Sequence, residues 1–128
     1  MIFAIMMAIT RFIIQYEEKD IRVMQLLLDW GANIDIQNRY GETPLFCAVR
    51  SENIQWVKLL LDRGAVANIK TNDDETPLFE AVRNRNIPII KLLLASGANV
   101  NIKTNLGYSP LSYAKTQQYI EIINLLTK

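Results

Sequence analysis

Residues 41–46 read Gly41-Glu42-Thr43-Pro44-Leu45-Phe46, and the pattern returns as Thr76-Pro77-Leu78-Phe79 and as Ser109-Pro110-Leu111-Ser112. The copies follow one another at an interval of 33 residues, from 43 to 76 and from 76 to 109. A second mark keeps the same interval, because Gly31-Ala32, Gly64-Ala65 and Gly97-Ala98 each follow a leucine-rich run. Two independent marks at one interval indicate that a single structural unit has been copied along the chain.

Composition places the chain among ordinary globular proteins. It has 128 residues, of which 50% are hydrophobic and 21% charged, which suits one domain. The formal net charge is +1, so the excess of Lys and Arg that marks nucleic-acid binding is missing and no nucleic-acid partner is expected. The lone Cys47 cannot form an internal disulfide. The fold therefore needs no oxidising compartment, and we expect a cytoplasmic protein or one delivered into a host cell.

The sequence offers little catalytic chemistry. It contains no histidine, which excludes most zinc sites and the familiar nucleophile–histidine pairs, and it has no glycine-rich phosphate loop, Gly-x-Ser-x-Gly elbow or Cys-x-x-Cys pair. The acidic run Asp73-Asp74-Glu75 lacks the alternating spacing of a calcium loop and is interpreted as a solvated turn. We therefore expect no enzyme, no metal and no cofactor, with carboxylate or lysine chemistry as the remaining alternative.

The copied unit resembles the ankyrin repeat. Its order is a turn, Gly-x-Thr-Pro-Leu, a short helix, Ile-x-x-Val-Lys-Leu-Leu-Leu, Gly-Ala and a polar extended segment. The resemblance implies an all-α solenoid of about four stacked helix-turn-helix repeats with hairpin-like connecting loops and atypical first and last repeats. It predicts a single domain over 1–128, divided into an N-terminal capping repeat at 1–39, repeats at 40–72 and 73–105, and a truncated C-terminal capping repeat at 106–128.

Local signals predict where the helices of each unit begin and end. Thr43 and Thr76 are expected to cap their helices, with a proline at the first helical position. Asn53 and Asn86 are expected to cap the second helices, and Pro88 is tolerated in a first turn. Gly64 and Gly97 should supply left-handed residues after the helices, and Asp74 should adopt positive φ where the other units have Gly41 and Gly107.

The apolar residues at helical spacing predict the core. In the first helices they are Leu45, Ala48, Val49, Leu78, Ala81 and Val82, and in the second helices Ile54, Val57, Leu60, Leu61, Ile87, Ile90, Leu93, Leu94, Ile120, Ile123, Leu125 and Leu126. Phe46 and Phe79 are expected to pack between adjacent repeats. Cys47 is interpreted as an inert packing residue, and Trp56 as a partly exposed one.

Met1–Tyr16 is almost entirely apolar and predicts a helix. It lacks the features of a signal peptide and is too short to span a membrane. It would cover the open end of the repeat stack, or it would expose an apolar patch that makes the chain a homo-oligomer, a self-associating structural domain. A missing upstream repeat, in a fragment of a longer ankyrin array, would hide the same patch.

By resemblance to ankyrin proteins, the chain is expected to be a non-enzymatic module that binds a partner protein on its concave face. The turn tips and inner helices form that face, and the residues mapped to it are Arg39, Tyr40, Glu42, Arg50, Ser51, Asn72, Asp73, Glu75, Arg83, Asn84, Asn105, Leu106, Tyr108, Thr116 and Gln117. Tyr and Arg are enriched among binding hot spots, so Tyr40, Arg50, Arg83 and Tyr108 are the strongest candidates.

Overall fold

A computed structural model describes residue 29 and residues 33–128 of the chain. The described part contains six helices and no strand, which confirms the all-α prediction. They are α3 (Pro44–Arg50), α4 (Ile54–Asp62), α5 (Pro77–Arg83), α6 (Ile87–Ala95), α7 (Pro110–Gln117) and α8 (Ile120–Leu126). The helix predicted over Met1–Tyr16, with its proposed role in self-association, lies outside the described residues.

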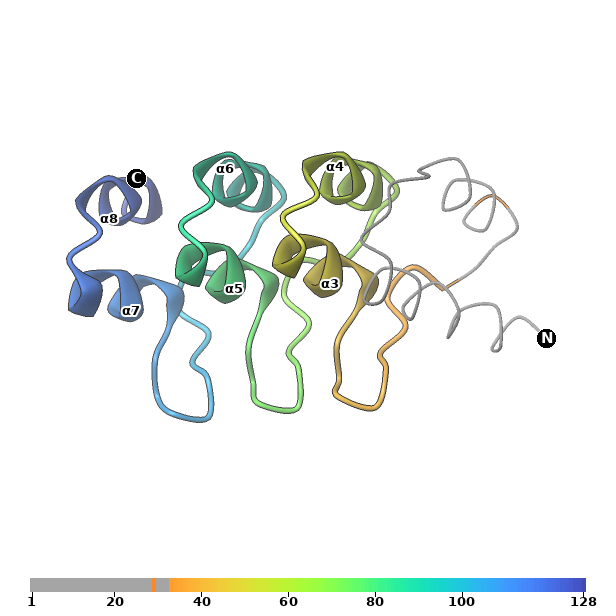
Figure 1. Ribbon diagram of the computed structural model, residues 1–128, viewed down its shortest axis with the longest axis horizontal. Coiled ribbons are helices and arrows are strands. Elements are labelled where there is room, and N and C mark those ends of the chain that lie inside the picture. The colour runs from red at the N-terminus through yellow and green to blue at the C-terminus, as the bar shows by residue number, and fades with distance from the viewer. Residues whose placement is uncertain (1–28, 30–32) are drawn as a thin grey trace.

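The helices form three pairs that stack side by side (Figure 1). The inner helices α3, α5 and α7 make one row, and the outer helices α4, α6 and α8 make a second row above it. Before each inner helix the chain turns back at a tip below the rows. We call residues 38–42, 71–75 and 104–108 the three tips, because each is closed by the same two backbone hydrogen bonds, as in Asn38 N to Glu42 O (3.0 Å) and Gly41 N to Asn38 O (2.9 Å).

The predicted caps of the helices are confirmed. Thr43 Oγ1 accepts a hydrogen bond from Phe46 N (3.1 Å) and Thr76 Oγ1 accepts one from Phe79 N (3.2 Å). Ser109 forms a reciprocal capping box with Ser112. The outer helices α4 and α6 begin at caps from Asn53 and Asn86, whereas Tyr119 before α8 makes no side-chain cap.

Left-handed residues recur at fixed places in the three units. Gly64, Gly97 and Asp74 adopt positive φ (88°, 87° and 62°), as the sequence predicted. A second set was not predicted. Residues 52, 85 and 118 follow the inner helices with φ of 57°, 56° and 60°, and all three are larger than glycine, namely Glu52, Arg85 and Gln118. Each inner helix therefore ends on a conformation that costs a side-chain-bearing residue some strain.

The core runs continuously between the two rows of helices. Most of the predicted core residues of α3 to α6 are fully buried, including Leu45, Val49, Leu78, Val82, Val57, Leu60, Ile90 and Leu93. Four others are half-buried and pack against them, namely Ile54, Leu61, Ile87 and Leu94. Two predictions were wrong. Trp56 is 2% exposed rather than partly exposed, and in α8 the buried residues are Ile122 and Leu126, whereas Ile120 is 64% exposed.

Residues 56, 89 and 122 occupy the same place in successive units, and Trp56, Ile89 and Ile122 are all buried there. An outer helix contacts its own inner helix and the outer helices beside it. A helix with neighbours on several sides buries a wider arc of its surface than a surface helix does. A prediction based on a single apolar stripe therefore did not include residues 56, 89 and 122.

Candidate functional site

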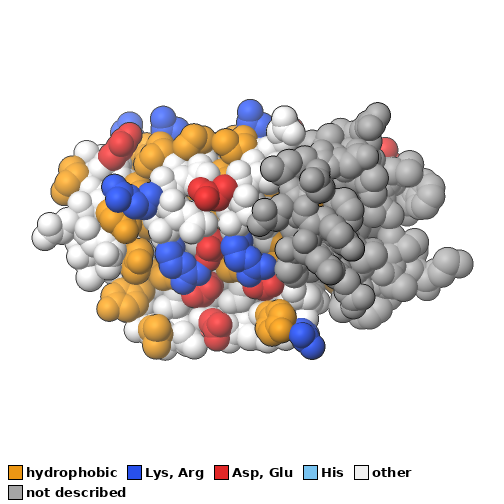
Figure 2. All heavy atoms as spheres, in the orientation of Figure 1, with side chains coloured by type: hydrophobic (Ala, Val, Ile, Leu, Met, Phe, Trp, Pro, Cys, Tyr) orange, Lys and Arg blue, Asp and Glu red, His pale blue; other side chains and the backbone are white. Residues whose placement is uncertain are grey.

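The tips and the inner helices form one strip along the molecule (Figures 1 and 2). Backbone hydrogen bonds join neighbouring tips, from Asn72 N to Tyr40 O and from Asn105 N to Asp73 O, both at 3.0 Å. The Asn72 side chain adds a bond from Nδ2 to Arg39 O (2.8 Å). The structure therefore brings the predicted residues of successive units into adjacent, ordered positions.

Exposure differs among the predicted residues of the strip. Most of those at the tips are exposed, namely Arg39, Tyr40, Asn72, Asp73, Asn105, Leu106 and Tyr108, and so are Thr116 and Gln117 in α7. Ser51 and Asn84 are half-buried because they are the C-cap residues of α3 and α5. Glu42 is buried and Glu75 is half-buried. Glu42 and Glu75 thus lie beneath the surface that the arginines and tyrosines form, whereas the third acidic residue, Asp73, is exposed.

Arg50 is held in a fixed orientation at the end of α3. Both of its Nη atoms donate hydrogen bonds to the Glu42 carboxylate, and the second of these, from Nη2 to Oε1, measures 3.3 Å. The guanidinium carbon lies 5.6 Å from the centre of the Phe46 ring, within the range of a cation–π contact. The side chain of Arg50 is 38% exposed, so one side of this group remains open to solvent.

Arg83 has the same arrangement one unit further along, with a second carboxylate. It donates to Glu75 from Nη1 (3.0 Å) and from Nη2 (3.2 Å), and Nη2 also donates to Glu80. Its guanidinium carbon lies 5.3 Å from the centre of the Phe79 ring. Figure 2 shows two basic side chains next to each other on this face, with acidic side chains beside them.

The third unit replaces this charged arrangement by aromatic rings. Tyr108, Tyr113 and Thr116 stand where the second unit has Glu75, Glu80 and Arg83. The Tyr113 ring makes edge contacts with Phe79 (5.2 Å), Tyr108 (6.0 Å) and Tyr119 (6.4 Å). The Phe79 contact confirms that this ring packs between adjacent units, and the strip changes from charged to aromatic along its length.

Comparison with protein families matches a model described as ankyrin repeats (3 copies) to residues 5–104 and 67–128. The chain is an ankyrin repeat protein. Ankyrin repeats are generally protein–protein interaction modules and typically not enzymes. A comparison with curated proteins finds no match. Family membership therefore identifies the fold and a general binding role, and the partner has to be argued from the strip itself.

Sequence reasoning missed two residues that shape the ankyrin strip. Glu80 is 5% exposed and accepts hydrogen bonds from Arg83 and from Asn84 Nδ2 (3.3 Å). Tyr113 joins the aromatic contacts of the third unit. An alignment of the units would have drawn attention to both residues. The equivalent positions 47, 80 and 113 hold Cys47, Glu80 and Tyr113, so the type of side chain differs in every copy.

Burial and hydrogen bonding shift the pKa values of Glu42, Arg50 and Arg83 in opposite directions. Burial alone would raise the pKa of Glu42, but hydrogen bonds from Arg50 and Asn38 outweigh it and hold the pKa below the ordinary value of 4.5. Burial alone would lower the pKa of Arg50 and of Arg83, yet hydrogen bonds to their carboxylate partners raise both. Glu42, Arg50 and Arg83 are therefore ionised across the physiological range.

The depressed pKa of Glu42 predicts that acid weakens the first pair. Because the folded-state pKa lies below 4.5, the pair stabilises the fold fully above pH 4.5, and this stabilisation disappears as the pH falls through the folded-state pKa. We expect Glu42→Gln to lower the free energy of unfolding by about 1 kcal/mol at pH 7, since Arg50 is partly solvent-screened. Urea unfolding should show the difference between wild type and variant shrinking as the pH falls below 4.5; a difference that is constant with pH would contradict the assignment.

Cys47 lies beneath the same pair and is fully buried. Burial and the nearby Glu42 carboxylate raise the pKa of its thiol to about 12. A basic neighbour is present, because Arg50 Nη2 lies 3.8 Å from the Cys47 Sγ atom, but it does not reverse this shift. The interpretation of Cys47 as a packing residue is consistent with a thiol that stays protonated.

We expect the Cys47 thiol of the folded protein to react with an aromatic disulfide reagent at pH 8 at least about 100-fold more slowly than the urea-unfolded chain. The reason is that both burial and the raised pKa remove accessible thiolate. Absorbance of the released thiolate measures both rates. Equal rates in folded and unfolded protein would show that the thiol is accessible.

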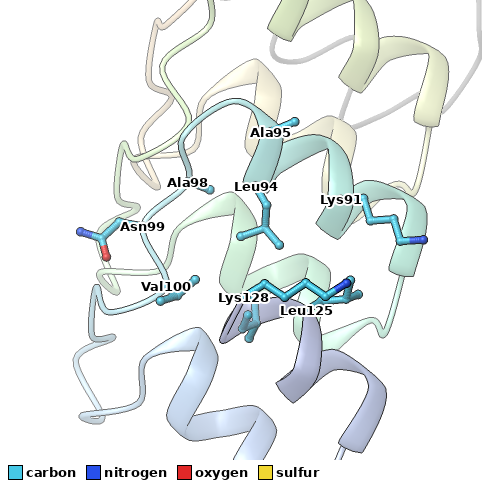
Figure 3. A pocket seen from close by; sticks show the side chains of 9 residues that line it. Lys91, Leu94, Ala95, Ala98, Asn99, Val100, Leu125 and Lys128 are labelled. Carbon is cyan, nitrogen blue, oxygen red and sulfur yellow. The ribbon is translucent and has the colours of Figure 1, made fainter.

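A groove with a volume of about 620 Å³ lies away from the strip (Figure 3). It lies between α6, the segment after it and α8, with Leu94 and Leu125 among its apolar lining residues and Lys91 and Lys128 among its basic ones. The segment after α6 also contacts the preceding unit, because Asn68 Nδ2 donates a hydrogen bond to Gly97 O (3.2 Å).

Two further observations bear on alternative chemistry. Within residue 29 and residues 33–128, no group of three or more His, Cys, Asp or Glu side chains is arranged to hold a metal ion. Among the helices α3 to α8, none is long and apolar enough to cross a membrane.

Proposed function

We propose that this ankyrin domain is a non-enzymatic module that binds a partner protein on the strip of tips and inner helices. The observation that supports this most is that Arg50 and Arg83 are held by the same kinds of side-chain contact in successive units. Each guanidinium is oriented by a phenylalanine ring and by carboxylates while part of it faces solvent. A side chain ordered before binding loses little conformational entropy in the complex, which favours its use as a hot spot.

Buried Glu42 and Glu80 have a supporting role in this proposal. Glu42 is predicted from the sequence to lie on the binding face, but its burial and its hydrogen bonds make it a residue that positions Arg50 rather than one that contacts a partner. Glu80 does the same for Arg83. The contacting residues that we propose are Arg50 and Arg83 with the exposed rings of Tyr40 and Tyr108, which are 54% and 40% exposed.

Affinity capture with the immobilised full chain, followed by mass spectrometry, tests the proposal. A protein captured by the wild-type chain should be lost when Tyr40, Arg50, Arg83 and Tyr108 are all replaced by alanine. A matched variant carries alanine at four exposed positions of the outer helices, namely Gln55, Lys58, Lys91 and Glu121, and should retain the partner. Equal retention by both variants would overturn the mapping.

The fourfold variant leaves two buried carboxylates without their arginines, so its fold needs a separate check by circular dichroism. A milder variant avoids this difficulty. Tyr40→Ala with Tyr108→Ala leaves every carboxylate with its arginine, and it should weaken binding while lowering the unfolding midpoint only slightly, through the lost edge contact between Tyr108 and Tyr113. Unchanged binding by a folded double-tyrosine variant would remove these rings from the proposed contact surface.

A further inference from the structure

The side chains at the ends of the three tips form an ordered row. Tyr40, Asp73 and Leu106 occupy the same place in successive units, and we call them the tip row. Tyr40 is 54% exposed and Leu106 is 80% exposed, while Asp73 between them is also exposed. Figure 2 shows this edge of the molecule with hydrophobic side chains on either side of an acidic one. The row therefore reads apolar, acidic, apolar.

The hydrogen bonds between tips keep this order rigid. Asn72 N donates to Tyr40 O, and Asn105 N donates to Asp73 O, so the backbone of each row residue is tied to the next tip. Neither bond uses a side chain of the row. The three side chains are thus free to contact a partner while their spacing is set by the stacking of the units.

Charge at the centre of the row is not balanced locally. Among the described residues, Asp74 pairs with Lys70 (3.8 Å) and Glu75 pairs with Arg83 (3.0 Å), whereas no cation forms an ion pair with Asp73. Arg39 lies at one end, with its guanidinium carbon 4.9 Å from the centre of the Tyr40 ring. A partner group opposite Asp73 would therefore meet a negative charge with an apolar side chain on each side.

We propose that the tip row binds an extended protein segment that carries a basic side chain between two apolar side chains. This inference rests on the proposed function and names the chemistry of the partner. Packed helices lie about 10 Å apart, and a chain in the extended polyproline II conformation advances about 3.1 Å per residue and returns to the same face every three residues. The basic residue therefore follows the first apolar residue by about three positions, and the second apolar residue follows the basic one by about three, so that all three side chains face the tip row.

Synthetic peptides provide the test. The probe is the capped peptide Leu-Gln-Gln-Arg-Gln-Gln-Leu, compared with the same peptide carrying Glu in place of Arg, and binding to the full isotope-labelled chain is followed by NMR titration. We expect the arginine peptide to bind about fivefold more tightly to the wild-type chain, with shifts at residues 40, 73 and 106. The variant Asp73→Lys should reverse the preference, because the Asp73 side chain makes no hydrogen bond on which the tip depends.

The apolar contacts are tested separately. Leu106→Ser should weaken binding of the arginine peptide, whereas Ile120→Ser should not, although Ile120 is also a large exposed apolar residue. Equal binding of the two peptides, or no reversal in Asp73→Lys, would overturn the proposal. So would tighter binding of a peptide in which six residues separate the same groups, which is helical spacing. If the two peptides bind equally while the fourfold alanine variant still loses a captured partner, only this inference is wrong. If the fourfold alanine variant retains every captured protein, the proposed function is wrong.

Discussion

Replacing Ile90 by alanine is expected to lower the free energy of unfolding by about 3–4 kcal/mol, the middle of the range for truncating a buried isoleucine or leucine to alanine. Ile90 is 0% exposed and belongs to the core between the rows of helices. The outer helix α6 that carries it contacts α4 on one side and α8 on the other, so little of the surrounding structure can collapse into the space. Urea unfolding followed by circular dichroism measures the loss.

The matched control is Ile123→Ala, which makes the same chemical change at the same place in the last unit. Ile123 is half-buried, and α8 has a described outer neighbour on one side only. We expect a loss of about 1–2 kcal/mol there, because less apolar surface returns to water and the site can relax. Equal losses in the two variants would contradict the view that neighbouring units supply much of the stability of each unit.

Gly41→Ala is expected to lower the free energy of unfolding by about 2–3 kcal/mol, through backbone strain and a steric clash. Gly41 has φ of 76°, and a Cβ atom there would lie 2.7 Å from Asn72 N and 2.7 Å from Asn72 Oδ1. The clash would push apart the first and second tips at the point where Asn72 N donates to Tyr40 O. Thermal or urea unfolding detects the change.

Gly107→Ala separates the two causes. Gly107 has φ of 89°, but a Cβ atom would have no heavy atom within 4 Å, so only the strain remains and we expect about 1 kcal/mol. The second tip carries a Cβ atom at the equivalent place, on Asp74 with φ of 62°. A loss for Gly41→Ala no larger than that for Gly107→Ala would contradict the steric contribution.

Much of the fold could be predicted because its signals are local and occur more than once. A threonine followed by proline specifies a capped helix start, and the pairs at 43 and 76 behave as predicted. The left-handed residues 52, 85 and 118 gave no such signal, because none of them is glycine. The buried column of Trp56, Ile89 and Ile122 was missed for a different reason, since its burial depends on neighbouring helices rather than on the helix itself.

The strip was only partly predictable. Its exposed tips follow from the order of the repeat, and residues 40, 73 and 106 lie where expected. Burial of Glu42 and Glu80 was not foreseen, because a charged residue is by default assigned to the surface. Only the structure shows that an arginine of the same unit pairs with each carboxylate and also contacts a phenylalanine ring, and that the third unit exchanges this set for tyrosines.

The bonds from Asn72 N to Tyr40 O and from Asn105 N to Asp73 O exist only while adjacent units remain stacked. These two amide protons consequently act as local reporters of separation at two successive junctions, and hydrogen exchange can compare them within one molecule. An array that comes apart from its C-terminal side would release the Asn105 proton to solvent before the Asn72 proton, and opening from the other side would invert that order.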